Sequence, residues 1–457
     1  MYNMAQQLPK TISAWQLMNF LRPGTIDITS ELHLTKTRRM PSIMSPDQLL
    51  IKVKAASLNP VDSLLIYGYG SSSFNLLRRL TSSYGYFGVP DIENTIISES
   101  SGFPFTPGRD FSGQIVDMGP EVAASNLTTS ESKLCIGTNV AGATWPFLSS
   151  TGSGALAEYI VCPANYVTPL PSNVSFITAA AIGYAGLTAW SALVDYGGVQ
   201  PILKTYSNRA SLLNNTSTTN NLILIIGATG GVGFIAAQLA KLWGWRVHIT
   251  CPSDDKALTL MKSLQIEEIF PHPAKIPSLM KYDLIIDCVR PDYINTDTPF
   301  SSSTTNTTTY TSSNKQSSQY TFLNTLVPYL PPMLSYLNAS SSKSRYVMLN
   351  PSLLHLTDYW GPFLGTGLAL TQIISTRIAA IFSVKTDNVV SLTNCDIIRW
   401  AFFKPNNKAL HYLLNLVASK QLIIPIDTVY NFSQVPDAFN RLYTKGVRGK
   451  LVVKMNE

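Results

Sequence analysis

The chain of 457 residues is poor in charge and gathers no dense cluster of either sign. Asp, Glu, Lys and Arg make up only 13% of it, against a usual share of roughly 25%. The excess of 34 basic over 27 acidic residues gives a formal charge of +7, but the basic residues form no stripe of the kind that reads nucleic acid. We therefore expect no nucleic-acid partner.

The five cysteines are odd in number and lie far apart in the sequence. None of them belongs to a CxxC pair or to a His/Cys cluster with the spacing of a zinc site. This usage favours reduced thiols and a reducing compartment. The sequence therefore predicts no metal site.

Targeting and membrane signals are also weak. The first residues lack the apolar run of a signal peptide and carry few cations for a mitochondrial presequence. The most membrane-like stretch, residues 363–384, contains Arg377 and two glycines near its start. A charge at that depth disfavours a spanning helix, so we expect no transmembrane segment.

The pattern of the chain changes twice. Residues 11–177 hold short alternating runs between many Gly and Pro, which predicts an irregular β-rich domain. Residues 178–390 alternate strand and helix patterns, which predicts a doubly wound parallel sheet and an α/β fold. The first style returns over residues 391–457, so we expect both ends to form one domain with the second inserted between them.

The inserted domain is expected to open with an Ala-rich helix over residues 177–198 that stops at a Gly pair. Strands are then predicted over 221–226, 246–251, 282–289 and 345–350, with helices over 232–242 and 254–264. Two Ser/Thr/Asn-rich segments, near 205–220 and 292–319, lack apolar spacing and are expected to be disordered surface insertions.

A glycine-rich turn, Gly-Ala-Thr-Gly-Gly-Val-Gly over residues 227–233, stands between the first strand and helix of this domain. Glycine permits a sharp turn and lets a pyrophosphate approach backbone N–H groups, and the helix aims its positive end at the phosphate. A Walker A loop is excluded because no Lys-Ser/Thr pair follows. The glycines at 227, 230, 231 and 233 therefore predict a dinucleotide site, the alternative being a tight strand–helix connection.

The second strand ends without the acidic residue that holds the ribose 2′-hydroxyl in NAD-selective sites. Pro252 and Ser253 follow that strand, and the next residues, Asp254 and Asp255, are expected to cap a helix. A 2′-phosphate would meet no carboxylate there, so NADPH is the predicted cofactor. The side chains expected to hold that phosphate are Ser253 with Arg246 or Lys256.

Several runs of the chain occur in the order of one known family. They are KAASLNPVDSLLIYGYG (54–70), PGRDFSGQIVDMG (107–119), GALAEYIVCPANYVTPLP (154–171), AAAIGYAGLTAWSAL (179–193), the glycine turn, and RGKLVV (448–453). Together they resemble the medium-chain dehydrogenases/reductases, in the zinc-free quinone oxidoreductase branch. The runs YGYG, FPFTPGRDFSG and RWAFF (399–403) are similar to the mitochondrial, reticulon-interacting members of that branch.

The resemblance implies a GroES-like catalytic domain with an inserted Rossmann domain. It also implies hydride transfer from NADPH to a quinone or an α,β-unsaturated carbonyl. Zinc-dependent members place a ligating Cys in the stretch 59–62 and a His-Glu pair where this chain has Arg109 and Asp110. Since neither is present, we expect a reaction that is independent of zinc.

The resemblance also assigns site residues. The pyrophosphate is assigned to Thr229, Gly231 and Val232, the cofactor contacts from the other domain to Ala401, Phe403 and Arg448, and the nicotinamide side to Asn59. Read alone, Phe403 is a core aromatic, Arg448 a strand-end charge and Asn59 a cap of the turn at Pro60.

The sequence alone does not determine which residue donates the proton. Some members place a Tyr where this chain has Leu64, so Tyr67 and Tyr69 are the nearby candidates for protonation or substrate orientation, with core packing as the alternative.

A second function is also open, because the chain departs from the family pattern at Pro252, Arg290 and Pro291. The alternative is a cofactor-binding scaffold that acts through a partner with little or no turnover. The resemblance further implies a mitochondrial location (the alternative being cytoplasmic), a reticulon-type membrane protein as partner, and a homodimer.

Overall fold

The computed structural model describes two compact units, each with its own sheet and core. The first comprises residues 1–187 with 403–457, and the second comprises 188–402. The described residues are 8–22, 27–73, 75–76, 103–128, 134–145, 154–202, 221–289, 333–338, 341, 343–349, 353–383, 397–444 and 446–455. Both predicted Ser/Thr/Asn-rich insertions, and the departures at 290 and 291, lie outside these ranges.

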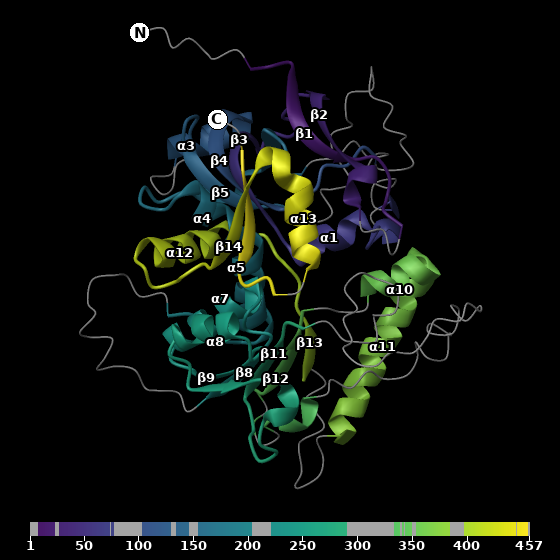
Figure 1. The fold of residues 1–457 in the computed structure, drawn as a ribbon, viewed down its shortest axis with the longest axis vertical. Coiled ribbons are helices and arrows are strands. Elements are labelled where there is room, and N and C mark those ends of the chain that lie inside the picture. The colour runs from purple at the N-terminus through teal and green to yellow at the C-terminus, as the bar shows by residue number, and fades with distance from the viewer. Residues whose placement is uncertain are drawn as a thin grey trace. The chain divides into compact units, whose positions relative to one another are not determined.

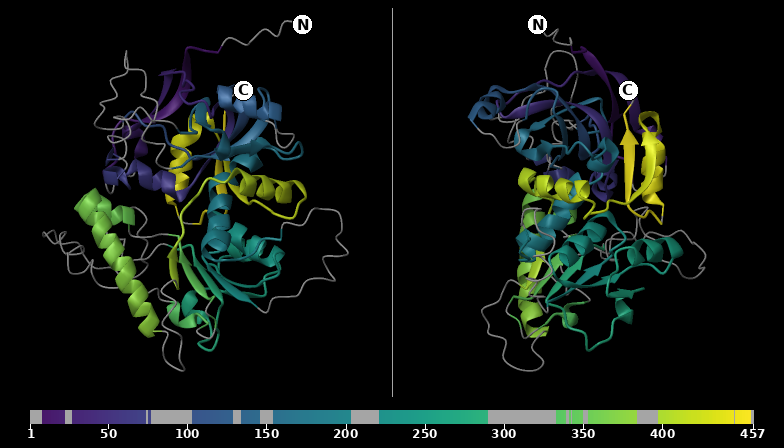
Figure 2. Two further views of the ribbon diagram at one scale, coloured as in Figure 1. Left: turned by 180° about the vertical axis from the view of Figure 1, so that it is seen from behind. Right: turned by 90° about the vertical axis from the view of Figure 1, so that its left-hand side faces the viewer.

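The first unit is built on a seven-stranded sheet to which both ends of the chain contribute (Figure 2). The strand order is β14-β15-β3-β4-β5-β7, and β6 also pairs with β3. Its strands are β3 (Gln48–Leu58), β4 (Asp110–Met118), β5 (Asn139–Ala143), β6 (Tyr159–Pro163), β7 (Val167–Pro169), β14 (Ile426–Asn431) and β15 (Lys450–Lys454). Since β15 runs antiparallel to β3 and starts beside its end, the last strand of the chain begins next to residue 59.

Smaller elements surround this sheet. A separate antiparallel pair is formed by β1 (Thr11–Leu17) and β2 (Leu32–Arg39). The α-helices are α1 (Pro60–Ile66), α3 (Pro120–Thr128), α4 (Phe176–Ala180), α12 (Asn407–Ala418) and α13 (Val435–Tyr443), with 3₁₀ turns η1 (Ile28–Ser30), η3 (Ala164–Tyr166) and η8 (Phe432–Gln434). Among them, α12 buries Leu410, Leu413 and Leu414 on one face.

The second unit has a six-stranded, all-parallel sheet in the order β10-β9-β8-β11-β12-β13 (Figure 1). The strands are β8 (Leu222–Ile226), β9 (Arg246–Thr250), β10 (Glu268–Phe270), β11 (Leu284–Asp287), β12 (Arg345–Met348) and β13 (Ile398–Trp400). Numbered along the chain, this order is 3-2-1-4-5-6, the doubly wound arrangement whose ligands bind outside the carboxyl ends where the order reverses. The predicted α/β fold class is confirmed, and the reversal lies between β8 and β11.

Helices connect these strands and cover both faces of the sheet, so the central strands are apolar along their whole length. Every residue of β8 and β11 is buried, as expected for central parallel strands covered on both faces. The helices are α7 (Gly231–Leu242), α8 (Asp255–Lys262), α10 (Leu353–Trp360) and α11 (Pro362–Ser383), with a π-helical stretch η4 (Ser191–Tyr196) and 3₁₀ turns η5 (Pro273–Lys275) and η7 (Leu334–Tyr336).

The helix predicted over residues 177–198 is broken near residue 182, and this part of the prediction is wrong. It is divided into α4, α5 (Gly183–Trp190) and η4, and ends at Gly197 and Gly198 as expected. The cause lies far away in the sequence, because the Asp110 carboxylate accepts the backbone N–H of Tyr184 in the first turn of α5. A carboxylate at a new helix start is favourable because it meets unpaired N–H groups and the positive end of the dipole.

The membrane-like stretch forms α11, which packs along α10. Its Arg377 donates from Nε to the backbone oxygen of Ile398, 3.2 Å away, on the edge strand β13. The charge that disfavoured a spanning helix therefore satisfies an edge carbonyl of the sheet. In the part of the chain that the structure describes, no helix is both long and apolar enough to cross a membrane.

Candidate functional site

The glycine turn follows β8 and is tied to the neighbouring strand β9. Gly227 has a φ of +80°, and its N–H donates to Thr250 Oγ1 at 3.1 Å. The N–H of Ala228 donates to the backbone oxygen of the same threonine at 3.0 Å. Thr250 ends β9 and is 4% exposed. The turn is thus fixed at the carboxyl end of the sheet, where its strand order reverses.

Two of the four glycines are required by close contacts. A Cβ at Gly233 would lie 2.5 Å from the oxygen of Gly227 and 2.9 Å from Cα of Ala228. A Cβ at Gly227 would lie 2.7 Å from Cγ2 of Val289, in addition to the strain of its positive φ. A Cβ at Gly230 would have no neighbour closer than 3.6 Å. Space for the turn therefore depends on positions 227 and 233.

The start of α7 offers backbone donors to an anion. Gly230 is its N-cap and supplies no side-chain oxygen, while the oxygen of Gly230 accepts the N–H of Phe234 at 2.9 Å. The N–H groups of the first helical residues have no partner within a helix, and here they belong to Gly231, Val232 and Gly233. Together with the positive end of the helix dipole, this donor set fits a pyrophosphate.

The ribose side of the turn bears out one expectation and corrects another. Asp254 caps α8, accepting the N–H of Ala257 at 2.9 Å, as predicted, whereas Asp255 is the first residue of that helix and not its cap. Arg246 begins β9, at the amino end of the sheet, and pairs with Glu267 at 2.5 Å. Because ligands of such sheets bind at the carboxyl ends, the assignment of Arg246 to a 2′-phosphate is wrong. Ser253 and Lys256 are both exposed next to the turn's partner strand, and the predicted role of Ser253 stays a prediction.

We expect Thr250→Val to weaken the glycine turn. The substitution keeps the shape of the side chain but leaves the N–H of Gly227 without its acceptor, which costs about 1–3 kcal/mol of the free energy of unfolding. Urea denaturation measures this loss, and fluorescence titration with NADPH should show several-fold weaker binding. Thr259→Val, at an exposed position of α8, is the control. Wild-type stability and affinity in Thr250→Val would show that Thr250 does not hold the glycine turn in place.

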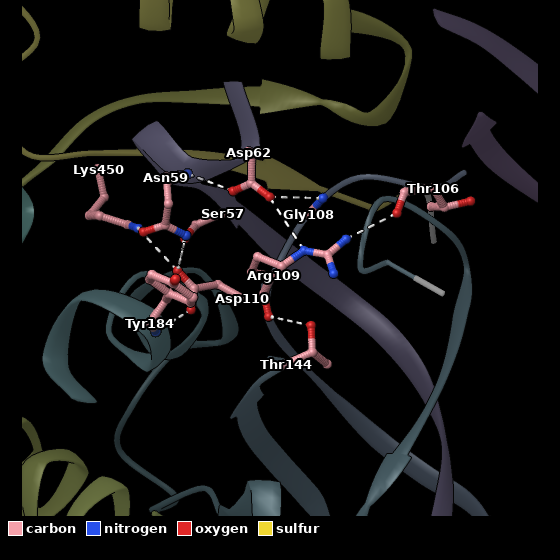
Figure 3. A network of polar contacts seen from close by, with 10 residues as sticks. All are labelled: Ser57, Asn59, Asp62, Thr106, Gly108, Arg109, Asp110, Thr144, Tyr184 and Lys450. Atoms are coloured by element: carbon pink, nitrogen blue, oxygen red, sulfur yellow. Dashed lines mark hydrogen bonds and ion pairs between the residues drawn. The ribbon is translucent and has the colours of Figure 1, made fainter. Parts of the chain in front are cut away.

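A buried polar network in the first unit gathers around Asp110 (Figure 3). Its Oδ2 accepts from Ser57 Oγ at 2.8 Å, Asn59 Nδ2 at 2.8 Å and Lys450 Nζ at 3.0 Å, while its Oδ1 accepts the backbone N–H of Tyr184. Lys450 Nζ also lies 2.5 Å from Asn59 Oδ1. The side chain of Asn59, which follows β3, is thereby joined to the starts of β4 and β15.

A second buried pair, Asp62 with Arg109, adjoins this network (Figure 3). Both side chains have 0% exposure, and Arg109 Nε lies 3.6 Å from Asp62 Oδ1. Asp62 also accepts the N–H groups of Asn59 at 2.8 Å and Gly108 at 3.1 Å. Burial raises the pKa of the Asp62 carboxyl from 3.8 to about 6, although Arg109 opposes the shift. Burial likewise lowers the pKa of the Arg109 guanidinium.

The two predicted tyrosines lie at the end of α1. Tyr67 is its C-cap, and its ring makes an edge contact with Tyr443 of α13, with ring centroids 5.7 Å apart. Burial raises the pKa of Tyr67. Tyr69 lies between Gly68 and Gly70, both with positive φ. The contact between Tyr67 and Tyr443 is typical of core packing. The proton-donor role of both tyrosines stays a prediction.

The residues assigned to the cofactor by resemblance lie in well-anchored segments. Ala401 is 1% exposed and donates its N–H to the oxygen of Met348 at 2.9 Å. Phe403 is 4% exposed and stacks on Tyr184, with ring centroids 4.2 Å apart. The N–H of Arg448 donates to Asp427 Oδ1 at 3.0 Å. These contacts are within the units, and the predicted contacts with cofactor stay predictions.

Lys450 and Thr250 are among the members of these arrangements that sequence reasoning missed, as are Asp110 and Ser57. The signal for Lys450 was its place in RGKLVV, directly after Arg448 and a glycine. The signal for Thr250 was its place at the end of the strand that neighbours the turn. Within the described ranges, no group of three or more His, Cys, Asp or Glu side chains is arranged to hold a metal ion.

Comparisons with known proteins agree on one family. The model of the Alcohol dehydrogenase GroES-like domain matches residues 45–172, and that of the Zinc-binding dehydrogenase matches residues 368–453. A solved quinone oxidoreductase from Coxiella burnetii has the same fold, with a TM-score of 0.60 and 22% identity over 98% of this chain and 100% of that one.

Curated relatives match between about half and nearly all of the chain. NAD(P)H oxidoreductase RTN4IP1, mitochondrial, from Danio rerio is 27% identical over 93% of this chain and 88% of its own length. Reticulon-4-interacting protein 1, mitochondrial, from Caenorhabditis elegans is 29% identical over 46% of this chain and 47% of its own length. Trans-enoyl reductase pgmF from Aspergillus terreus is 27% identical over 63% of this chain and 67% of its own length. The predicted resemblance is confirmed: the chain is similar to the medium-chain dehydrogenases/reductases, and over most of its length to a protein named as an NAD(P)H oxidoreductase.

Proposed function

We propose that the chain is an NADPH-dependent, zinc-independent oxidoreductase that transfers a hydride to a quinone or an α,β-unsaturated carbonyl. The observation that carries the proposal is the position of the glycine turn. It lies where the strand order of the parallel sheet reverses, and it leads into α7, whose first turn has no side-chain cap. The names of the similar NAD(P)H oxidoreductase and trans-enoyl reductase support the same reaction class.

In this proposal NADPH supplies the hydride, which reduces the acceptor by two electrons, and one proton completes the product. The chain's own part is to bind and orient. Backbone N–H groups of Gly231 and Val232, with Thr229 beside them, bind the pyrophosphate, since they stand at the positive end of α7. Asn59 is assigned to the reacting side, and Tyr67 or Tyr69 to the proton.

The preference for NADPH follows from the end of β9. Thr250 is occupied by the glycine turn, Asp254 caps α8, and the exposed Ser253 and Lys256 are the groups next to a 2′-phosphate. Residues 250–253 contain no Asp or Glu, whose carboxylate would repel that phosphate. Fluorescence titration with both reduced cofactors tests this, and tighter binding of NADH would reject the preference.

Turnover separates the reductase from the alternative of a cofactor-binding scaffold. Stopped-flow mixing of protein and NADPH with a panel of quinones and enones follows NADPH absorbance. We expect acceptor-dependent oxidation of NADPH. Binding of NADPH without oxidation above the protein-free rate would instead support the scaffold.

Gly231→Val tests the placement of the pyrophosphate. A bulky side chain at the first residue of α7 stands where the phosphate must approach the backbone. We expect loss of most NADPH affinity with the fold retained, as judged by circular dichroism. Unchanged affinity would show that the pyrophosphate binds elsewhere.

The location and partners belong to the same proposal. We propose a mitochondrial protein, because the similar oxidoreductase is named mitochondrial, and we retain a reticulon-type membrane protein and a second copy of the chain as partners. A fluorescent fusion that stays in the cytoplasm would reject the location. Light scattering of the purified protein decides between monomer and dimer.

A further inference from the structure

We propose that Lys450, together with Asp110, is a positioning residue that fixes the orientation of the Asn59 carboxamide, so that Asn59 presents an N–H donor to a carbonyl oxygen of the reactants. The inference rests on the proposed function, which supplies that carbonyl. The three side chains come from β15, β4 and the residue before α1, and all converge in the first unit (Figure 3).

The Asn59 side chain is not needed to begin α1. An Asn before a helix commonly accepts the N–H of the third helical residue through its side chain. Here that N–H, of Asp62, donates to the backbone oxygen of Asn59 at 2.9 Å. In return the Asp62 carboxylate accepts the N–H of Asn59 at 2.8 Å. The start of α1 thus has backbone hydrogen bonds of its own, and the carboxamide bonds to Asp110 and Lys450.

The partners of the carboxamide determine which end carries the oxygen. The Lys450 ammonium can only donate, and it lies 2.5 Å from Asn59 Oδ1. The Asp110 carboxylate is surrounded by donors, and it accepts from Asn59 Nδ2 at 2.8 Å. A flipped carboxamide would set –NH₂ against the ammonium and oxygen against the carboxylate, losing two charge-assisted hydrogen bonds. Chemistry thus fixes the orientation.

A donor remains on the oriented carboxamide. An amide nitrogen carries two hydrogens, and in the described ranges Asn59 Nδ2 donates to Asp110 alone. The oxygen end is held by Lys450. Asn59 therefore suits an acceptor such as a carbonyl oxygen, which is present both in the nicotinamide carboxamide and in a quinone or enone.

Lys450 is itself held in place. Its N–H donates to the oxygen of Pro425 at 2.9 Å. The preceding Gly449 has a φ of +108°, and a Cβ there would lie 2.4 Å from the same oxygen. Lys450 is 4% exposed and Asp110 is 0% exposed. A buried ion pair is weak evidence for stability, since apolar replacements often serve the fold as well, so we assign this pair to geometry.

The test compares Lys450→Met with Lys454→Met, a matched change at the exposed end of the same strand. We expect kcat of Lys450→Met to fall about 10- to 100-fold, because a loosely held donor is misplaced during reaction, and Lys454→Met to behave as wild type. Asn59→Ala and the double variant Asn59→Ala/Lys450→Met complete the cycle. If Lys450 acts through Asn59, the double variant is no slower than Asn59→Ala; additive losses would overturn the inference.

The affinity for NADPH tells which carbonyl is bound. Weaker binding of NADPH in both Lys450→Met and Asn59→Ala identifies the nicotinamide carboxamide. Unchanged binding with a reduced kcat identifies the carbonyl of the substrate. Wild-type kcat and wild-type affinity in Lys450→Met would reject the positioning role.

Folding is checked by thermal unfolding, because Lys450→Met leaves Asp110 buried without its cation. If that variant does not fold, Lys450→Met/Asp110→Asn removes both charges and leaves the carboxamide unoriented. Reduced turnover in this folded variant supports the inference, and wild-type turnover contradicts it.

Failure of the proposed function has a separate signature, which is absence of NADPH oxidation by the wild type. The orientation is then read from the side-chain NH₂ signals of Asn59 in ¹⁵N-labelled protein, identified by their loss in Asn59→Ala. We expect slow hydrogen exchange that becomes fast in Lys450→Met but not in Lys454→Met. Equal exchange in all three proteins would overturn the inference.

Discussion

Gly233→Ala is expected to abolish NADPH binding at concentrations that saturate the wild type. The added Cβ would lie 2.5 Å from the oxygen of Gly227 and 2.9 Å from Cα of Ala228. Both are backbone atoms of the same turn, so neither can rotate away. The turn must widen, which moves the N–H groups that we propose bind the pyrophosphate. Because overpacking of this kind costs about 1–3 kcal/mol, the free energy of unfolding should fall as well.

Gly367→Ala is the matched control in the same unit. Gly367 lies within α11, and a Cβ there would meet no atom within 4 Å apart from the helix's own neighbouring backbone. An alanine in a helix interior is favoured over glycine by about 0.5–1 kcal/mol, so this variant should be at least as stable as the wild type and bind NADPH equally well. Fluorescence titration and urea denaturation measure both variants. Equal affinity in Gly233→Ala and Gly367→Ala would remove the turn from the cofactor site.

The sequence was most informative where structure is local. The strand, turn and helix over residues 221–242 follow from an apolar run, four glycines and a helical period, and each forms within a residue of its expected place. The absence of a terminal acid on β9 and the capping role of Asp254 were also readable, because both depend on neighbours in sequence. Local pattern is thus sufficient to predict the strand, the glycine turn and the helix.

The sequence was least informative where partners are distant. Near residue 182, Gly183 is a weak local signal for a helix break, and the carboxylate that accepts the N–H of Tyr184 belongs to the distant Asp110. Likewise, Lys450 and Asn59 are separated by 391 positions, and only the antiparallel pairing of β15 with β3 brings them together. Arg246 was misassigned for a simpler reason: it begins its strand, and parallel strands present their other ends to a ligand.

Arg109→Met is expected to lower the free energy of unfolding at pH 7 by about 3–5 kcal/mol, the usual cost of breaking a buried ion pair from one side. The substitution leaves Asp62 as a buried carboxylate with no cation within the pair, since both side chains have 0% exposure. The backbone N–H groups of Asn59 and Gly108 still donate to it, but they do not replace a full positive charge.

The cost of Arg109→Met should grow with pH. Burial raises the pKa of Asp62 from 3.8 to about 6, so the folded state binds this proton more tightly than the unfolded chain does. The contribution of Asp62 to stability is therefore complete below about pH 4 and is lost as the pH rises through about 6. Without Arg109 the pKa of Asp62 rises further, which extends the loss to higher pH.

Urea denaturation at pH 5, 6, 7 and 8 tests this dependence, with Arg246→Met as the control. Arg246 pairs with Glu267 on the surface, where the side chains are 48% and 43% exposed, and such pairs contribute about 0–1 kcal/mol. The control should therefore change little at any of these pH values. If Arg109→Met lowers the free energy of unfolding equally at pH 5 and pH 8, Asp62 stays ionised in the folded variant. Arg109 would then not control the protonation of Asp62.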